Sequence, residues 1–333
     1  MSSIVNRGRY SVSGSLGGVV KKYTMLFVLL GLCAFFAVIS NSFLTAENFL
    51  NLATQNTYIL VAAVGLSFIM MGGAMDLSVG YQISATGVLT AILMVKLQAN
   101  PVLAMASGMG LCILLGALNG VLSVKLKVHP IMITIATMIV FQGVSYLLSS
   151  GNSFYPFPDS FRLITRGNVL GIRVDFIIAI VSVAIASFVY NKTYYGRYVK
   201  AMGGNVEASR LAGINVDFMR VTTFMISGFF VAIATFILIS RQGTMNSTIG
   251  PGTEFVCMTG AMLGGIGMGT SGNGKVWGLV TGIFIIAIIA NGMQLAGWNQ
   301  YIQYVIKGAV LILAIGFDQA QKTRKAKPTK AVA

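Results

Sequence analysis

Residues 58–80 read Tyr-Ile-Leu-Val-Ala-Ala-Val-Gly-Leu-Ser-Phe-Ile-Met-Met-Gly-Gly-Ala-Met-Asp-Leu-Ser-Val-Gly, and this stretch decides the fold class. It has no charged side chain before Asp76. Its apolar part approaches the ~20 residues that a helix needs to cross the hydrocarbon core of a bilayer. Gly72-Gly73 and Asp76 then interrupt the run before a second apolar stretch begins. We predict a membrane span, a tight break and a further span.

The rest of the chain repeats this pattern. Hydrophobic residues make up 56% of the 333 residues and charged residues 9%, whereas about a quarter of a soluble domain is charged. The 39 glycines suit close contact between helices. We predict an all-α polytopic membrane helical bundle of about ten transmembrane spans, at residues 24–40, 58–75, 83–97, 101–124, 130–148, 174–190, 218–240, 255–268, 276–295 and 301–317. The third and eighth are short and contain glycine, so we expect each to be either full or broken.

The distribution of positive charge predicts the orientation. An even number of spans places both termini on one side. Most of the 23 Lys and Arg residues fall in segments that share this side, and cytoplasmic segments carry the positive excess of membrane proteins. We predict cytoplasmic termini, with a basic lead at 1–23, a membrane domain at 24–318, an outer loop at 149–173, an inner loop at 191–217 and a basic tail at 319–333. The net charge of +15 then reflects topology, not nucleic-acid binding.

Residues typical of catalytic or metal sites are scarce. Each cysteine lies inside an apolar run, and no pair has the spacing of a metal site. The single histidine, His129, precedes Pro130 and is expected to cap the helix that begins there. We predict no enzyme activity, metal or cofactor in this chain. The cysteines are Cys33, Cys112 and Cys257.

One glycine-rich segment, residues 269–276, is similar to a phosphate-binding loop. That loop requires Ser or Thr after its lysine to hold Mg²⁺. Here Val276 follows Lys275. We therefore interpret the segment as a turn between two spans, and we expect the chain to have no nucleotide site of its own.

Asp76 has two interpretations. In the first, an acidic residue at membrane depth binds a proton or cation and drives secondary transport. In the second, Asp76 or Ser78 accepts a backbone N–H at the start of the next helix, while Gly72, Gly73 and Gly80 permit a tight break. We favour the second interpretation, because capping is the commoner role of Asp and Ser at helix starts.

Lys307 lies near the middle of the last predicted span. A bare charge there costs about 2.5–3.5 kcal/mol, so we expect Lys307 to face protein or a water-filled path, with Asp76 or Glu254 as its nearest candidate partner. Other polar residues of the spans either line that path or form hydrogen bonds between helices, each worth about 0.6 kcal/mol. These residues are Ser67, Asn119, Thr134, Thr137, Gln142, Asn291 and Gln294.

The inner loop contains a predicted short helix at residues 206–212. Asn205 is a good N-cap, Glu207 favours the positive end of the helix, and Gly213 is a good C-terminal stop. A helix of about two turns is unstable alone in water. It must dock, either on its own bundle or into a groove of a soluble partner.

From about residue 43 to residue 318 the chain resembles the permease subunits of ribose-type monosaccharide ABC importers. Four stretches carry the resemblance: residues 48–80 with Asp76-Leu77-Ser78-Val79-Gly80, residues 119–138 with Pro130 to Thr134, the loop 196–216, and residues 291–308 with Lys307. The resemblance assigns coupling to an ATPase to Gly203, Gly204, Asn205, Glu207, Ala208, Arg210, Leu211, Ala212 and Gly213. Our candidates for the translocation path or a helix break are Gly72, Gly73, Asp76, Ser78, Asn119, Thr134, Asn291 and Lys307.

The resemblance also implies partners. A second permease subunit, the same or a sister chain, completes the path. An ATPase subunit, in two copies or fused, receives the helix at 206–212 and binds ATP-Mg. An extracytoplasmic substrate-binding protein delivers a sugar-like solute, and ATP-driven closure alternates access. The resemblance places the chain as a multi-pass protein among the lipids of a bacterial cytoplasmic (inner) membrane.

Two other classes of function stay open. An ion-coupled secondary transporter that uses Asp76 needs an ion gradient and no ATPase. A structural membrane subunit has no path and tolerates apolar replacements in its spans. Both leave the close match of loop 196–216 unexplained.

Overall fold

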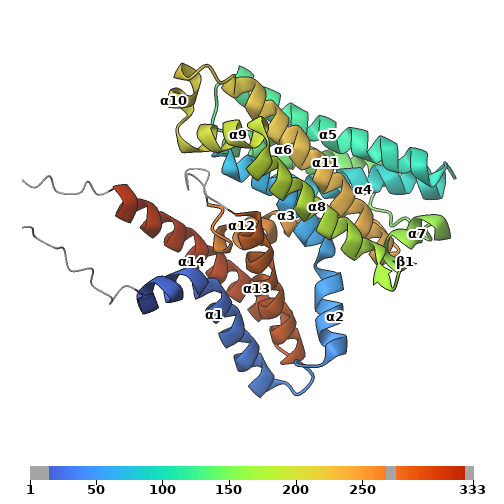
Figure 1. The fold of residues 1–333 in the computed structure, drawn as a ribbon. Helices are drawn as coiled ribbons and strands as arrows, with labels where there is room; N and C mark the ends of the chain where they lie inside the picture. The colour runs from blue at the N-terminus through green and yellow to red at the C-terminus, as the bar shows by residue number, and fades with distance from the viewer. Residues whose placement is uncertain (1–14, 268–274, 327–333) are drawn as a thin grey trace, which may run out of the picture.

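The computed structural model describes residues 15–267 and 275–326. Within these residues the regular structure is helical except for one short β-hairpin and an isolated bridge between Phe154 and Met245, and Figure 1 shows the helices. In chain order the elements are α1 (Ser15–Ile39), α2 (Ala46–Gln55), α3 (Thr57–Met71), α4 (Val79–Ala91), the π-helical turn η2 (Ile92–Lys96), α5 (Pro101–Lys125), α6 (Pro130–Ser149), α7 (Asp159–Arg166), β1 (Asn168–Val169), β2 (Ile172–Arg173), α8 (Val174–Lys192), α9 (Tyr194–Gly204), α10 (Val206–Leu211), α11 (Val216–Gln242), α12 (Thr253–Leu263), α13 (Val276–Leu295) and α14 (Gln300–Ala326).

The prediction of an all-α polytopic membrane protein is confirmed. Within the described residues, six helices are long and apolar enough to cross a membrane, and the pair α2–α3, bent by 42°, makes up to seven. The predicted span at 58–75 corresponds to α3 alone, which ends already at Met71, and α2 precedes it across a bend at Asn56. The predicted span at 83–97 begins earlier, at Val79, and finishes in η2. Shorter apolar helices occupy the predicted first, eighth and tenth spans.

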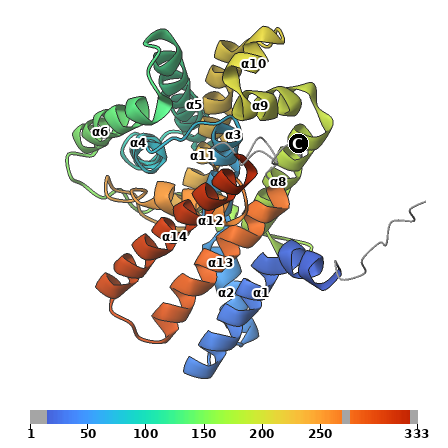
Figure 2. The same cartoon turned by 90° about the vertical axis from the view of Figure 1, so that its left-hand side faces the viewer.

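Helix α3 is the centre of the bundle. It is apolar on all sides, the pattern of a helix surrounded by protein, and all of its residues from Val61 to Met71 are buried. It packs against α8, α11 and α12. Figures 1 and 2 show α5 and α11 beside each other in one group, with α1, α13 and α14 in a second group on the other side of α3.

Glycines set the distance between α5 and α11. A Cβ at Gly228 of α11 would collide with the carbonyl oxygen of Cys112, and a Cβ at Gly116 of α5 would collide with the carbonyl of Phe224. Small residues at such crossings let helix backbones approach in a membrane, where packing drives association. The pair α5–α11 therefore depends on residues that a larger side chain cannot replace.

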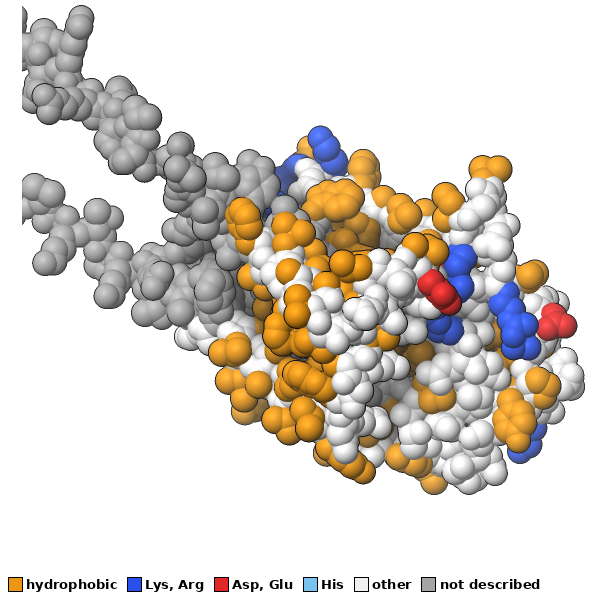
Figure 3. Space-filling view, turned by 90° about the horizontal axis from the view of Figure 1, so that it is seen from below, with side chains coloured by type: hydrophobic (Ala, Val, Ile, Leu, Met, Phe, Trp, Pro, Cys, Tyr) orange, Lys and Arg blue, Asp and Glu red, His pale blue; other side chains and the backbone are white. Residues whose placement is uncertain are grey.

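The outward faces of α5 and α6 are apolar and exposed. Val102, Leu114, Met132 and Leu147 each have more than half of their surface accessible. On the face drawn in Figure 3, hydrophobic side chains cover much of the surface, most charged side chains lie toward the right-hand end, and a few Lys or Arg side chains lie at the upper edge. This distribution suits a protein whose sides contact lipid or another membrane subunit.

We expect Gly228→Ala to lower the temperature midpoint of unfolding in detergent, because the added methyl group must displace the backbone of α5. Overpacking of this kind costs about 1–3 kcal/mol. Gly110→Ala in α5 is the matched control, because a Cβ there meets nothing within 4 Å. Differential scanning fluorimetry of the two purified variants measures the difference. Equal midpoints would contradict a close crossing at Gly228.

Candidate functional site

A break between α3 and α4 lies inside the bundle. Helix α3 ends in a Schellman motif: Ala74 N–H donates to the carbonyl of Ile69 (3.1 Å), and Gly73 N–H donates to the carbonyl of Met70 (3.0 Å). Gly73 has φ = +79°, which a residue with a Cβ rarely adopts. The glycine pair thus ends the helix while satisfying carbonyls that would otherwise lack a donor.

Asp76 organises the polar contacts after this break. Its Oδ1 accepts the backbone N–H of Ser78 (2.8 Å) and the hydroxyl of Ser78 (2.6 Å), and its Oδ2 accepts Nε2 of Gln82 (2.8 Å). Asn119 of α5 joins the network by donating to the hydroxyl of Ser78 (2.8 Å). All four side chains are buried. Asp76 thus accepts the backbone N–H of Ser78, the N-cap residue of α4, and among the described residues the Ser78 side chain itself makes no capping hydrogen bond to the first turn of that helix.

Gln82 was not among the predicted site residues. It lies one helical turn after Ser78, and its Nε2 also donates to the Ser78 hydroxyl (2.8 Å). The spacing Ser78–Gln82 is an i,i+4 pair on one face of α4, which the sequence does display. Gln82 joins the site only because the carboxylate of Asp76 lies over the same face of α4, and the spacing of residues alone does not predict that position.

Helix α9 rests directly on this break. A Cβ at Gly203 would collide with the carbonyl oxygen of Met71, and Gly73 faces Gly203 from the other side of the contact. At the other end of α9, a Cβ at Gly196 would collide with the carbonyl of Val189 in α8. Helix α9 is therefore joined closely to both α8 and the end of α3.

A tyrosine fixes α9 to α11 as well. The hydroxyl of Tyr195 donates to the hydroxyl of Thr222 at 3.1 Å. Burial raises the pKa of Tyr195 to about 12, with the Thr222 hydrogen bond as a smaller opposing effect. The phenol stays protonated at physiological pH and keeps its role as donor.

Helix α10 is preformed, as predicted. The side chain of Asn205 accepts the N–H of Ala208 (2.9 Å) at the start of the helix. At its end Gly213 has φ = +81°, and Ile214 N–H donates to the carbonyl of Ser209 (3.0 Å), which completes another Schellman motif. These caps stabilise a helix that is too short to persist alone.

Most of α10 faces outward. Ser209 is its only buried residue, and Leu211 is 90% exposed. The helix contacts α9 and the start of α11, where Arg210 forms an ion pair with Asp217 (3.1 Å). Figures 1 and 2 both show α10 at the edge of the molecule. Of the two predicted docking modes, this exposure favours a groove on a partner.

The break after α3 has a counterpart after α12. Gly265 has φ = +82°, and Ile266 N–H donates to the carbonyl of Ala261 (2.8 Å) as Ala74 does to Ile69. A Cβ at Gly264 would collide with the carbonyl of Gly278 in α13. The similar sequences Met71-Gly72-Gly73 and Leu263-Gly264-Gly265 thus form the same helix end. The rest of the second glycine-rich segment, including Gly269–Gly274 of the suspected phosphate loop, lies outside the described residues.

The other predicted path residues are not brought to one place. Asn291 exchanges hydrogen bonds with Asn48 (2.9 and 3.0 Å), which joins α13 to α2. The hydroxyl of Thr134 donates to the carbonyl of Ile131 in its own helix (3.1 Å). His129 caps α6 by accepting the N–H of Ile131, as predicted. These contacts are structural.

Lys307 meets neither of its expected partners. The carboxylate of Glu254 accepts the N–H of Gly252 (3.0 and 3.1 Å), while Asp76 is held by Ser78 and Gln82. Within residues 15–267 and 275–326, the ion pairs are Arg173–Asp175 and Arg210–Asp217. Lys307 instead lies 5.7 Å from the ring centre of Tyr304 and lines a cavity. The proposed pairing was wrong because both acids fold back on their own helix starts.

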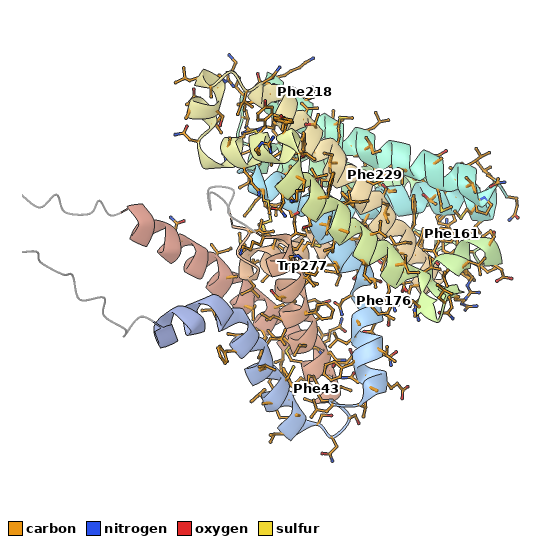
Figure 4. All side chains as sticks on the ribbon, viewed as in Figure 1. Phe43, Phe161, Phe176, Phe218, Phe229 and Trp277 are labelled. Atoms are coloured by element: carbon orange, nitrogen blue, oxygen red, sulfur yellow. The ribbon has the colours of Figure 1, made fainter. Side chains whose placement is uncertain are left out.

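A contact that the sequence did not suggest fixes the bend before α3. The guanidinium of Arg241, at the end of α11, donates to the carbonyl of Thr54, the second-to-last residue of α2. Nearby, Phe176 of α8 and Trp277 of α13 help to line an apolar cavity of about 230 Å³. Figure 4 shows both rings between the two helix groups.

Together, a polytopic bundle with a broken central span and a preformed, exposed helix joined to that break defines a membrane transport subunit of the permease class. A family model described as "Branched-chain amino acid transport system / permease component" matches residues 48–315, and the chain belongs to this family.

Curated relatives cover nearly all of the chain. The ribose import permease protein RbsC of Escherichia coli (strain K12) is 30% identical over 302 residues, 89% of this chain and 93% of the relative. RbsC of Bacillus subtilis (strain 168) is 33% identical over 304 residues, 91% and 94% of the two chains. The L-arabinose transport system permease protein AraH of E. coli (strain K12) is 32% identical over 327 residues, 98% and 99%. No solved structure matches the chain.

We expect Asp76→Ala to destabilise the protein more than Asp76→Asn. The amide keeps an acceptor for the Ser78 N–H and can donate to a reoriented Gln82, whereas alanine leaves buried donors unsatisfied at a cost of about 1–3 kcal/mol each. Thermal unfolding midpoints measure the ranking. Solute uptake tests the competing interpretation, because an ion-coupling carboxylate would leave both neutral variants inactive, while a capping Asp76 leaves Asp76→Asn active.

Proposed function

We propose that this chain forms, with a second permease subunit, the translocation path for a monosaccharide or similar small polar solute. Membership in a permease family makes the chain the membrane subunit of an ATP-driven importer, and a separate ATPase subunit hydrolyses ATP. The cargo class is inferred from relatives whose names specify ribose and L-arabinose. The chain is a multi-pass protein of a bacterial inner membrane.

The observation that carries this proposal is the contact between α9 and the α3–α4 break. An exposed, capped helix α10 presents Leu211 to a partner. Helix α9 connects it to Met71 and Gly73 through the glycine contact of Gly203. A partner that moves α10 therefore acts on the backbone beside Asp76. We infer that the partner is the ATPase and that residues 203–213 are its docking element.

The topology that fits this role has ten spans. We propose that the bent pair α2–α3 counts as one span, and that the shorter apolar stretches Phe27–Ile39, Thr253–Leu263 and Gln300–Gly316 supply the other three. Both termini and α10 then lie in the cytoplasm. The domain limits are a lead at 1–23, the permease domain at 24–318 and a tail at 319–333.

The partners follow from the same role. A second permease subunit, identical or sister, packs on an exposed apolar face, and lipid covers the rest. The ATPase acts in two copies or as a fusion and binds ATP-Mg. A substrate-binding protein delivers cargo on the outer side. Ion coupling through Asp76 is the weaker alternative, since Ser78 and Gln82 already occupy both of its carboxylate oxygens.

We expect Leu211→Glu to weaken binding of the ATPase subunit about tenfold or more. Full burial of a leucine side chain contributes about 1.5–3 kcal/mol to the free energy of binding, and a carboxylate in its place loses that contribution. Leu170→Glu is the matched control, because Leu170 is 99% exposed in the β1–β2 turn at the opposite end of α8. Co-purification of the ATPase in mild detergent and ATP-dependent uptake in proteoliposomes provide the measurement. Equal binding by both variants would remove α10 from the interface.

We expect Gly203→Ala to separate ATP hydrolysis from transport. The added methyl group must push α9 away from Met71, while α10 remains able to bind its partner. Uptake per ATP hydrolysed should fall about tenfold, the size of an ordinary coupling free energy. Gly143→Ala in α6 controls for glycine replacement, since a Cβ there meets nothing within 4 Å. If Gly203→Ala transports as much solute per ATP hydrolysed as the wild type, the contact between Gly203 and Met71 does not couple hydrolysis to transport.

A further inference from the structure

Two hollows meet at Lys307. A cavity of about 530 Å³ lies between the starts of α3 and α12 and the sides of α13 and α14. A more open hollow of about 350 Å³ lies at the turn from α13 to α14. Tyr304 and Lys307 line both, so these two side chains form the partition between them. Each hollow falls in the size range of small-molecule sites, roughly 300–1,000 Å³.

The open hollow is lined by amide and aromatic side chains. Gln300 donates through Nε2 to the hydroxyl of Tyr304 (3.3 Å), and Gln303 donates through Nε2 to the carbonyl of Trp298 (3.0 Å). Their Oε1 atoms accept no hydrogen bond from any residue in the described part of the chain. Gln294 of α13 completes the polar wall. The hollow therefore offers hydrogen-bond acceptors and donors beside flat apolar rings.

Lys307 contributes a cation that no described residue pairs with. Its Nζ lies 5.7 Å from the centre of the Tyr304 ring, and Lys307 lies in the middle third of the predicted last span. A lysine at such a position is retained against an insertion cost when it faces a pathway or a ligand. Because an ammonium group only donates hydrogen bonds, a ligand of Lys307 must accept them.

The composition of the lining selects the class of ligand. Neither hollow has a carboxylate or a guanidinium in its lining. Anionic lipid headgroups are recognised by clusters of Lys and Arg, whereas Lys307 is the one cationic side chain in the lining of the two hollows. Hydroxyl groups suit amides, which donate and accept, together with one ammonium donor.

We propose that the open hollow is a cargo subsite for a neutral, polyhydroxylated solute. Lys307 and the glutamines bind its hydroxyl groups, and Trp298 and Tyr304 cover its C–H faces. No residue of α3 lines the subsite itself, but the cavity beside it reaches Tyr58 and Ile59 at the start of α3, whereas α9 contacts the end of that helix. This inference rests on the proposed function and deepens it.

Transport kinetics of Lys307→Met test the subsite. The complete importer is reconstituted with its ATPase and substrate-binding protein, and uptake of D-ribose, L-arabinose and D-allose is measured. For the sugar that the wild type transports, Lys307→Met should raise KM about tenfold or more, the loss of one hydrogen bond from a charged donor. Lys96→Met, which replaces an exposed lysine outside both hollows, should leave KM unchanged. The amount of folded Lys307→Met should not fall, because the variant removes a charge from a span.

Protection of an introduced thiol gives a second, direct readout. Lys307→Cys is made in a Cys33→Ser background, since Cys112 and Cys257 are buried. The transported sugar should slow labelling of the new thiol by a maleimide. If added phosphatidylglycerol slows the labelling and the sugar does not, the proposal is overturned in favour of a lipid headgroup. Unchanged KM and labelling would also overturn it. Failure of the wild type to transport any sugar would instead reject the proposed function.

Discussion

The structure depends on how a chain can be broken inside a membrane without leaving backbone groups unsatisfied. Hydrocarbon offers no hydrogen bonds, so every N–H and C=O exposed by a break needs a partner within the protein. At the end of α3 the glycine pair supplies a Schellman motif, and Asp76 then accepts the first N–H before α4. Here the carboxylate is buried, and Gln82 and Ser78 surround it with donors. The polar network therefore supplies the hydrogen bonds that this break would otherwise leave unmade.

The same break explains several glycines far away in the sequence. A helix end with exposed carbonyls can be approached closely only by a residue without a side chain. Gly203 takes that position against Met71, and Gly278 takes the equivalent position against Gly264. Two helix ends of the same construction thus each receive a neighbouring backbone. We interpret the pair as traces of an internal duplication whose halves have acquired different neighbours.

The spans and the short helix could be predicted because their signals are local. Apolar runs gave the helices, and Asn205 and Gly213 gave both limits of α10 to within one residue. Helix α2 and the bend at Asn56 were missed because residues 46–56 contain Glu47, Asn48, Asn51, Gln55 and Asn56 and do not form an apolar run, and the Arg241 contact that fixes the bend comes from a distant helix end. Lys307 illustrates the same limit. The free-energy cost of placing Lys307 in a span could be predicted from the sequence. The residues that surround it could not, because they depend on how α13 and α14 pack against each other.

The close contact of Gly196 with α8 has a mechanical consequence. Because α9 begins against the backbone of α8 and ends against the backbone of α3, no loose linker lies between Val189 and Gly203. Helix α9 is therefore held at both ends by backbone contacts. Under the proposed function, a partner bound to α10 would act on α8 and on the buried central helix α3 through this one segment. Inserting flexible residues near Gly196 would then be expected to separate the two effects.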